Sequence, residues 1–494
     1  MGIVTKQASI SAFLGYAGVV IGFVNLTLLM ANWFTPVQVG LREVLLSVAV
    51  FGSQIAHFGT YRSLVKFYPF FKSNQGNYDN GLLRIGLTVP LFGFIVVSGI
   101  IILFKSQIVD YYIEKSPLFI EYFWFSFPLI FMLLFNNVFE SYLQARSKTA
   151  YSVFLKSVLT RLLTSFLLVL YYFSLIDFYQ FIVCFIFSYI VTIVLFIISL
   201  YQKGEFSLKL NPNFFTRRVR KLYFQYSSFS ILSGVASVLL NRIDILMISS
   251  IIGLASTSVY ANAVYLSVLV AIPGDSIAKI TMPLLSKSWK SKNIGEIKNL
   301  YQKTSATQYL LGGLLLILMW GSIDNFYSLQ REEYAEGKIV FLILGFAKLM
   351  NMLFGANGQI ISISKFYRFD TFTAILLGLL TVYTNHIFIP EWGIEGAAAA
   401  TGLSLLLFNM IRFYFVYTKL KIQPFTKSTI LISFVLLIGF VTNYLLPNLN
   451  HFILDTIYRS IIIAIVIVVP AYFLKVSEDF NHLILKNLNR LIKR

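Results

Sequence analysis

Residues 226–279 read YSSFSILSGVASVLLNRIDILMISSIIGLASTSVYANAVYLSVLVAIPGDSIAK, two long apolar runs joined by a short uncharged turn near Gly253. Each run is long and apolar enough for a membrane helix, which needs about 20 mostly apolar residues. Asn241, Arg242 and Asp244 interrupt the first run. Because a formal charge deep in a bilayer is costly, such residues are usually kept for a function. The stretch therefore predicts membrane-spanning helices and a first candidate site.

The composition of the whole chain supports a membrane protein. Its 494 residues are 57% hydrophobic and only 12% charged, which is typical of an integral membrane protein. The single cysteine, Cys184, allows no disulfide framework within one chain. The net charge of +19 comes from basic residues that lie mostly at the ends of apolar segments. We therefore expect membrane lipids, and not nucleic acid, as the partners of this charge.

The apolar segments predict an all-α polytopic fold with about fourteen spans. The first span is expected to be a membrane helix and not a cleaved signal peptide, because its apolar run is too long. Lys and Arg gather at both termini and in every second loop, which predicts that both termini are cytoplasmic. The predicted spans are residues 10–32, 43–61, 82–104, 119–143, 153–175, 178–201, 226–251, 258–280, 306–327, 338–363, 371–389, 394–418, 428–446 and 455–475.

Two pairs of segments indicate an internal repeat. TPVQVGLREVLLSVAV at 35–50 aligns with ASTSVYANAVYLSVLV at 255–270, and LFNNVFESYLQAR at 134–146 aligns with LFGANGQIISISK at 353–365. The nearly equal offset spans six helices, so the two copies would have parallel topology. We predict two pseudo-symmetric six-helix lobes plus two extra C-terminal helices. The predicted parts are an N-terminal lobe 1–201, a cytoplasmic basic linker 202–225, a C-terminal lobe 226–418, the added helices 428–475 and a basic amphipathic cytoplasmic tail 476–494.

Asp244 and Arg242 are candidate functional residues on different faces of one helix. Asp244 continues a stripe whose steps of three and four residues keep one helical face. Arg242 lies about 200° away from Asp244, so the two do not form a simple intrahelical pair. Asp244 is expected to face a cavity and bind a proton or cation, or else to pair with another helix. Arg242 would face the cavity or extend toward the outer interface. The stripe is Ser230, Gly234, Ser237, Asn241 and Asp244.

Lys348 is the second strong candidate. It lies near the middle of its span, on a face with small and polar residues. A cation on such a face predicts a cavity that attracts an anion. The alternative is a paired lysine that positions helices. The other residues of this face are Gly345, Asn351, Gly355, Gly358 and Ser362.

The weaker candidates for the substrate cavity are Gln54, His57 and Arg161. Gln54 and His57 share a helical face with Glu43, and Arg161 lies within the span 153–175. A comparable face of the first span carries mainly small residues, which usually indicates close helix packing. Packing is the alternative for Gln54 and His57 as well. The face of the first span is Ser11, Gly15, Gly18, Gly22 and Asn25.

The sequence contains no pattern typical of an enzyme. No Gly-rich phosphate loop follows a strand, and the four histidines are scattered. We therefore predict no catalytic residue, no metal and no bound cofactor. The enzyme alternative is a membrane polysaccharide polymerase or ligase, for which we would expect a substantial outer loop with clustered charges. The largest predicted outer loop, around 324–336, is too small for an enzyme domain.

Several motifs resemble one family of transporters. NRIDILMISSIIGLASTSVYANA resembles the helix 7–8 signature of polysaccharide-transport proteins, although Val259 stands where the family usually has glycine. WGIEGAAAATGL is similar to the family's helix 11–12 junction. FESYLQARSK and GQIISISKFYR resemble the inner ends of its helices 4 and 10. The residues that match the signature are Asp244, Gly253, Tyr260 and Ala263.

The family is that of the Wzx-type oligosaccharide flippases. They belong to the multidrug/oligosaccharidyl-lipid/polysaccharide exporter superfamily, with the MATE exporters and the lipid II flippase MurJ. The resemblance implies a bacterial inner-membrane transporter with two lobes and alternating access. Its implied substrate is an undecaprenyl-diphosphate-linked oligosaccharide for O-antigen, capsule or exopolysaccharide. It also implies a proton or sodium gradient as the driving force.

The resemblance gives the candidate residues roles. Lys348, Arg242 and Arg161 would meet the diphosphate, while Asn241 and Gln54 would meet sugar hydroxyls. A polysaccharide polymerase and chain-length proteins are further expected partners. A MATE-type drug exporter and a lipid II exporter are the alternatives within transporters. A drug exporter would favour an acidic cavity, whereas the deep cations here favour an anionic substrate.

Overall fold

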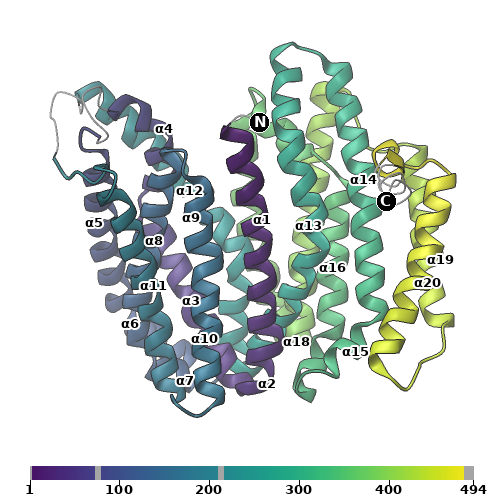
Figure 1. The fold of residues 1–494 in the computed structure, drawn as a ribbon, viewed down its shortest axis with the longest axis horizontal. Helices are drawn as coiled ribbons and strands as arrows, with labels where there is room; N and C mark the ends of the chain where they lie inside the picture. The colour runs from purple at the N-terminus through teal and green to yellow at the C-terminus, as the bar shows by residue number, and fades with distance from the viewer. Residues whose placement is uncertain (1–2, 73–78, 210–215, 483–484, 486–494) are drawn as a thin grey trace. The chain divides into compact units, whose positions relative to one another are not determined.

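The computed structural model describes residues 3–72, 79–209, 216–482 and 485. The regular elements of these residues are helices, joined by short turns and by one β-bridge between Lys72 and Asp79. The all-α fold class is therefore confirmed. The chain divides into two compact units, Met1–Ser258 and Val259–Arg494, whose helices are labelled in Figure 1.

The long helices of the first unit run roughly side by side in Figure 1. Two of its segments are π-helical, η1 in the first span and η3 in the fifth. The elements are α1 (Ile3–Phe23), η1 (Val24–Met30), α2 (Ala31–Trp33), α3 (Pro36–Ala56), α4 (Thr60–Phe71), α5 (Leu82–Leu103), α6 (Lys105–Tyr112), α7 (Pro117–Glu121), η2 (Phe123–Phe125), α8 (Ser126–Ala145), α9 (Thr149–Val153), η3 (Phe154–Leu159), α10 (Thr160–Tyr172), α11 (Phe178–Tyr201) and α12 (Arg217–Ile251).

The second unit contains most of α13 and all later helices. Two short elements, α15 and η4, connect α14 to α16. The elements are α13 (Leu254–Lys290), α14 (Ile294–Gly321), α15 (Ile323–Tyr327), η4 (Glu332–Glu336), α16 (Gly337–Leu353), α17 (Asn357–Ile363), α18 (Tyr367–Leu420), α19 (Lys427–Leu445) and α20 (Phe452–Phe473).

Local capping explains why α3 begins before the predicted start at residue 43. The Thr35 hydroxyl accepts a hydrogen bond from the Gln38 backbone N–H at 3.3 Å, and Gln38 Oε1 accepts one from the Thr35 N–H at 3.0 Å. This reciprocal capping box satisfies two N–H groups that a helix start leaves open. Pro36 adds a backbone angle suited to the first helical position. The helix therefore begins at Pro36.

The predicted span 43–61 is interrupted in the structure. α3 ends at Ala56 and α4 begins at Thr60. Between them, Phe58 and Gly59 have left-handed φ angles of 43° and 76°. A side chain at Gly59 would also collide with the carbonyl of Ser227 on α12. The predicted span corresponds to α3, but its predicted end at residue 61 was wrong, because the left-handed backbone and the close approach of α12 both require a turn after Ala56.

Two predicted spans lie in the long element α18. A straight helix of its 54 residues would measure about 80 Å, far more than the ~30 Å hydrocarbon core. Gly393 breaks it with φ 58° and ψ −137°, which separates two arms close to the predicted spans 371–389 and 394–418. In the described residues, 11 helices are long and apolar enough to cross a membrane, or up to 13 if two bent pairs each count as one span. The exact count of fourteen stays a prediction.

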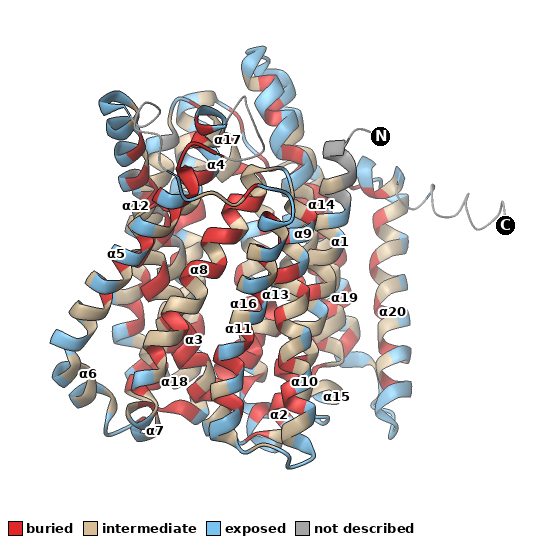
Figure 2. Ribbon diagram, turned by 60° about the vertical axis from the view of Figure 1, so that its left-hand side comes forward, coloured by how far each residue is buried: buried red, intermediate tan, exposed pale blue. Residues whose placement is uncertain are grey.

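Exposure identifies the lipid-facing surface. On α20, Ile457, Ile461 and Ile465 follow one another at every fourth position and are each at least half exposed. Figure 2 shows pale blue patches along α20 and red segments on α3 and α8. A row of exposed isoleucines on a helix is stable in lipid and costly in water. The protein is thus a multi-pass membrane protein.

The predicted lobe boundary and the contact boundary differ. The prediction places the seventh span in the second lobe, whereas the compact first unit extends to Ser258 and includes α12. α12 belongs to this unit because it packs along α3. The lobes and the repeat stay predictions. Residues 210–215 of the predicted linker, and 483–484 and 486–494 of the predicted tail, lie outside the described residues.

Candidate transport site

Arg161 lies in a groove that glycines of α1 leave open. A methyl group added at Gly18 would lie 2.5 Å from the Ser157 carbonyl oxygen and 2.8 Å from Arg161 Nη1. A methyl group at Gly22 would lie 2.8 Å from Arg161 Nε. The small face of the first span therefore packs closely, as its spacing indicates. It also provides the space in which the Arg161 guanidinium lies.

A polar clamp holds the same two helices together. Asn25 Nδ2 donates to the Arg161 carbonyl at 2.8 Å, and the Ser165 hydroxyl donates to Asn25 Oδ1 at 2.7 Å. Asn25 belongs to the π-helix η1. Arg161 is the second residue of α10, which directly follows the π-helix η3. Such π-helical turns are rare and often occur at functional sites. Arg161 is therefore held through its backbone carbonyl, while its side chain lies beside Gly18 and Gly22 of α1.

Arg242 contacts a buried carboxylate that the sequence analysis did not single out. Glu43 on α3 is fully buried and forms ion pairs with Arg42 and with Arg242, the latter at 3.4 Å. The Arg42 guanidinium also lies 4.9 Å from the ring centre of Phe185. This cluster of two arginines and one carboxylate joins α3 to α12. Neither predicted orientation of Arg242 included this partner.

Gln54 and His57 lie at the packed surface between α3, α4 and α12. The Gln54 amide occupies the space above Gly234, where a Cβ would collide with it. His57 is buried, its Nδ1 accepts the Gly59 N–H at 2.7 Å, and its ring centre lies 3.9 Å from that of Tyr61. Both side chains thus stabilise helix packing and the turn between α3 and α4. Their predicted contact with substrate stays a prediction.

The stripe on α12 is not uniform in burial. Asp244 is only 7% exposed, whereas Asn241 is exposed. Gly234 faces α3, and the Ser237 side chain lies outside the described residues. Asp244 is thus a buried carboxylate in a membrane helix, and such a group is a candidate site for a cation or a proton. Its predicted coupling role is untested by this geometry.

In the second unit, Lys348 is half-buried on α16. Asp275 on α13 interacts electrostatically with both Lys348 and Lys279. Asp275 was missed as a candidate, although it lies within an apolar run and four residues before Lys279, the spacing of neighbours on one helical face. This unit therefore contains an acidic group that interacts electrostatically with two basic groups.

An apolar cavity lies in the same unit. It has a volume of about 690 Å³ and is lined by α14, α16, α18 and α19. Leu316, Phe346, Leu406 and Leu436 are among its mostly hydrophobic lining residues. Its size lies within the range of small-molecule sites, which measure about 300–1,000 Å³. A cavity of this chemistry suits a hydrocarbon chain and not a sugar.

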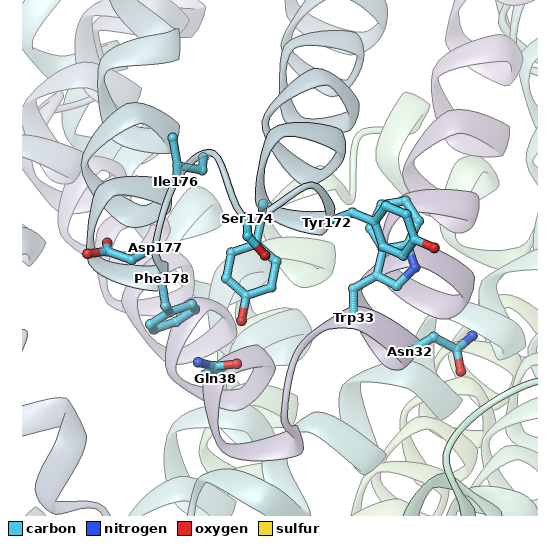
Figure 3. Close-up of a pocket in the computed structure, with 9 residues that line it drawn as sticks. Asn32, Trp33, Gln38, Tyr172, Ser174, Ile176, Asp177 and Phe178 are labelled. Carbon is cyan, nitrogen blue, oxygen red and sulfur yellow. The ribbon is translucent and has the colours of Figure 1, made fainter.

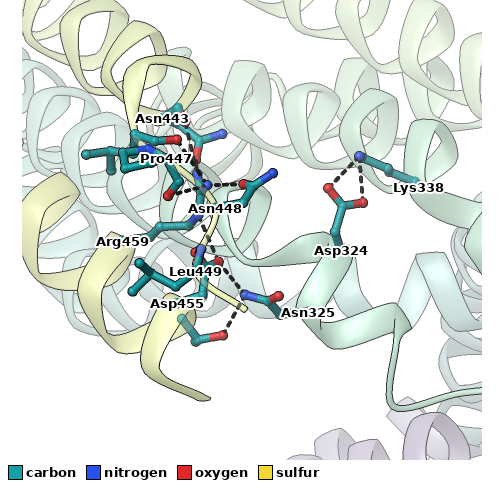
Figure 4. A network of polar contacts seen from close by, with 11 residues as sticks. Asp324, Asn325, Lys338, Asn443, Pro447, Asn448, Leu449, Asp455 and Arg459 are labelled. Atoms are coloured by element: carbon teal, nitrogen blue, oxygen red, sulfur yellow. Dashed lines mark hydrogen bonds and ion pairs between the residues drawn. The ribbon is translucent and has the colours of Figure 1, made fainter. Parts of the chain in front are cut away.

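A further buried ion pair in α20 was also missed. Arg459 Nε donates to Asp455 Oδ2 at 2.8 Å and Nη1 donates to the Asn443 carbonyl at 3.0 Å (Figure 4). Asp455 also accepts hydrogen bonds from the Leu449 N–H at 2.9 Å and from Asn325 Nδ2 at 2.7 Å. Charged groups with this many partners are typical of a structural pair. The network ties the α19–α20 loop to α15.

The described residues contain no group of three or more His, Cys, Asp or Glu that could hold a metal ion. The absence of a cofactor therefore stays a prediction, which this geometry does not decide. Several of the titratable groups described above form ion pairs, as Glu43 does with Arg42 and Arg242 and as Asp455 does with Arg459. What they offer chemically is binding and charge compensation.

Comparison with known proteins shows which solved structures share this fold. No family model matches the chain. Its structure is similar to the lipid II flippase MurJ in an inward closed conformation, with a TM-score of 0.71 and 14% identity over 92% of this chain and 98% of that one. It is also similar to an inward-facing multidrug resistance MATE transporter of the MOP superfamily, with a TM-score of 0.63 and 13% identity. This similarity covers 85% of the present chain and 98% of the MATE transporter.

One curated relative is similar in sequence. Over 223 residues the chain is 22% identical to the capsular polysaccharide biosynthesis protein CapF of Staphylococcus aureus. The matched region covers 44% of this chain and 55% of CapF. The match thus spans about half the length of the relative. The structural similarities confirm the MurJ- and MATE-like fold that the sequence motifs implied. Both structural relatives are transporters.

Proposed function

We propose that this protein is a flippase for an undecaprenyl-diphosphate-linked oligosaccharide in the bacterial inner membrane. It would work by alternating access, be driven by a proton or sodium gradient, and have both termini in the cytoplasm. The observation that carries the proposal is the similarity to the fold of a lipid II flippase over 92% of the chain. The distant capsule-biosynthesis relative supports an oligosaccharide as the cargo.

The charges in the spans suit an anionic lipid carrier. Moving a diphosphate through hydrocarbon requires groups that replace its lost hydration. In the proposed mechanism, Lys348 and Arg161 attract the diphosphate, and Arg242 contributes positive charge although it is paired with Glu43. Asn241 and Gln54 are the proposed partners of sugar hydroxyls, with His57 beside Gln54.

The remaining parts of the substrate need different surroundings. The apolar cavity of the second unit would accept part of the polyprenyl tail, because its lining is mostly aliphatic and aromatic. Asp244 is the proposed ion-coupling residue, since it is a buried carboxylate within a span. A polymerase and chain-length proteins of the same pathway are the proposed partners that receive the product.

A translocation assay tests the proposal directly. The full-length protein is reconstituted into vesicles that contain a fluorescent undecaprenyl-diphosphate-linked oligosaccharide, and a membrane-impermeant reagent measures the fraction exposed outside. We expect the protein to accelerate translocation without lengthening the oligosaccharide. Acceleration only for a cationic drug would support MATE-type export, and chain extension would support the polymerase alternative. Either result would overturn the proposal.

A further inference from the structure

An open pocket lies in the first unit, where α2 and the beginning of α3 meet the end of α10 and the beginning of α11. Its volume is about 620 Å³, within the range of small-molecule sites. In the predicted topology this end of the unit is the outer one. The lining residues are Asn32, Trp33, Gln38, Tyr171, Tyr172, Ser174, Ile176, Asp177 and Phe178 (Figure 3).

Aromatic rings line the pocket on two sides, with Trp33 and Tyr172 on one and Phe178 on the other (Figure 3). The ring centres of Trp33 and Tyr172 lie 4.7 Å apart at an interplanar angle of 34°. Phe34 is fully buried and packs edge-on against Tyr171 at 4.5 Å and Phe178 at 5.4 Å. Such contacts fix the orientation of the rings. Tyr171 and Phe178 are therefore held in place, and the Trp33–Tyr172 pair adds a second apolar surface beside the polar groups.

Two capping boxes position the polar lining groups. Gln38 accepts the Thr35 N–H through Oε1, so its two Nε2 hydrogens remain for a ligand. Asp177 Oδ1 accepts the Gln180 N–H at 2.7 Å, and Asp177 is the N-cap of α11. Both side chains are thus held by backbone contacts before any ligand binds. Preorganised groups lose little conformational entropy on binding.

This combination of groups suits a sugar ring. The negative face of an aromatic ring attracts the weakly positive C–H bonds of a pyranose, while amide and hydroxyl groups of the lining match its hydroxyls. The lining contains no Lys or Arg, which disfavours phosphate headgroups. Aromatic rings beside a carboxylate also suit quaternary ammonium groups. Here the positive end of α11 offsets the charge of Asp177, which weakens that alternative.

An ordinary interfacial tryptophan does not explain these observations. Trp and Tyr gather at membrane interfaces because their rings are amphipathic, as at Trp124, which is 54% exposed. Trp33 is less exposed and lies against Tyr172 at the edge of a cavity. We propose that this pocket is a carbohydrate-binding site for pyranose units of the cargo. The identity of the cargo rests on the proposed function, but the binding of a sugar does not.

Saturation-transfer NMR on the full-length protein in lipid nanodiscs tests this site. The probes are free glucose, galactose, mannose, N-acetylglucosamine, N-acetylgalactosamine and their common disaccharides, with glycerophosphocholine as the competing headgroup. We expect at least one sugar to bind saturably. Tyr172→Ala, at a 58% exposed position, should weaken this binding about tenfold. Trp33→Phe, which keeps a ring, should weaken it less. The control Trp124→Ala should leave it unchanged.

Three results would overturn the inference: no saturable binding of any sugar, equal binding by Tyr172→Ala, or displacement of the bound sugar by glycerophosphocholine. The translocation assay separates this inference from the proposed function. Sugar binding without translocation would contradict the flippase proposal alone. Translocation without sugar binding would contradict this site alone. Repeating the NMR measurement with the same sugars attached to a lipid carrier then shows whether the pocket binds the free or the lipid-linked sugar.

Discussion

At the scale of single residues, charged side chains in the spans have different surroundings. Glu43 lies between two arginines, and Arg161 lies over two glycines of α1. Arg459 is surrounded by carbonyl and carboxylate oxygens. Intramembrane charges default to a functional interpretation, but these contacts show that some of them hold helices together. Lys348 and Asp244 remain the stronger candidates for transport.

Lys348 tests the role of positive charge in transport. We expect Lys348→Ala to abolish polysaccharide export while the protein still reaches the membrane, because the diphosphate would lose a cation in low-dielectric surroundings. Lys348→Arg should retain part of the export. The measurement is surface polysaccharide together with protein in isolated membranes. The matched control is Lys338→Ala on the same helix, where Lys338 pairs with the exposed Asp324. Normal export by Lys348→Ala would refute the prediction of a cavity that attracts an anion.

Glu43 tests whether the arginine cluster is structural. Glu43→Ala leaves two guanidinium groups without this carboxylate, and the loss of one partner from a buried pair costs about 3–5 kcal/mol. Arg242→Ala should cost less, because Arg42 still pairs with Glu43. We expect the melting temperature of the protein in detergent to fall more for Glu43→Ala than for Arg242→Ala. Equal decreases would show that Arg42 does not compensate Glu43.

At the scale of elements, the glycines of α1 allow a direct test of close packing. Gly18→Ala places a methyl group 2.5 Å from the Ser157 carbonyl oxygen, and overpacking of this kind costs about 1–3 kcal/mol. At Gly15 nothing lies within 4 Å, so Gly15→Ala serves as the matched control. We expect a lower melting temperature for Gly18→Ala only. A decrease of the same size for Gly15→Ala would instead indicate a general effect on the helix.

The α19–α20 network should contribute to stability and not to the chemistry of transport. Arg459→Met removes donors from Asp455 and from the carbonyls at the end of α19, which should destabilise the protein by about 3–5 kcal/mol. Scanning fluorimetry in detergent should show a clear decrease of the melting temperature. Lys427→Met, at an exposed site in the first turn of α19, is the control. Loss of transport without loss of stability would assign Arg459 a different role.

At the scale of the whole molecule, the candidate residues are divided between two units. Arg161, Arg242 and Asp244 belong to the first, whereas Lys348 and the apolar cavity belong to the second. The fold is shared with transporters that carry very different substrates, so fold alone does not select the cargo. The charge and cavity chemistry of each unit must supply that selection.

Coupling to an ion gradient is a property of the whole transport cycle. In proteoliposomes, an imposed proton or sodium gradient should accelerate translocation by the unmodified protein. Asp244→Asn keeps the size of the side chain but removes its charge, so the acceleration should disappear while basal translocation remains. Asp324→Asn, at an exposed carboxylate, is the control and should respond normally. A normal gradient response by Asp244→Asn would exclude Asp244 as the coupling residue.

The sequence alone determined the class of the protein, most of its helices and where several of them begin and end. Apolar length predicts the spans but not all of their ends: α3 begins at Pro36, after the capping box of Thr35 and Gln38, and not at the predicted residue 43. Only the tertiary structure decided the partners of the buried charges. Helical spacing gives the direction of a side chain but not the neighbour it meets. The contact of Arg242 with Glu43, of Arg161 with Gly18, and the pocket around Trp33 all join helices distant in sequence.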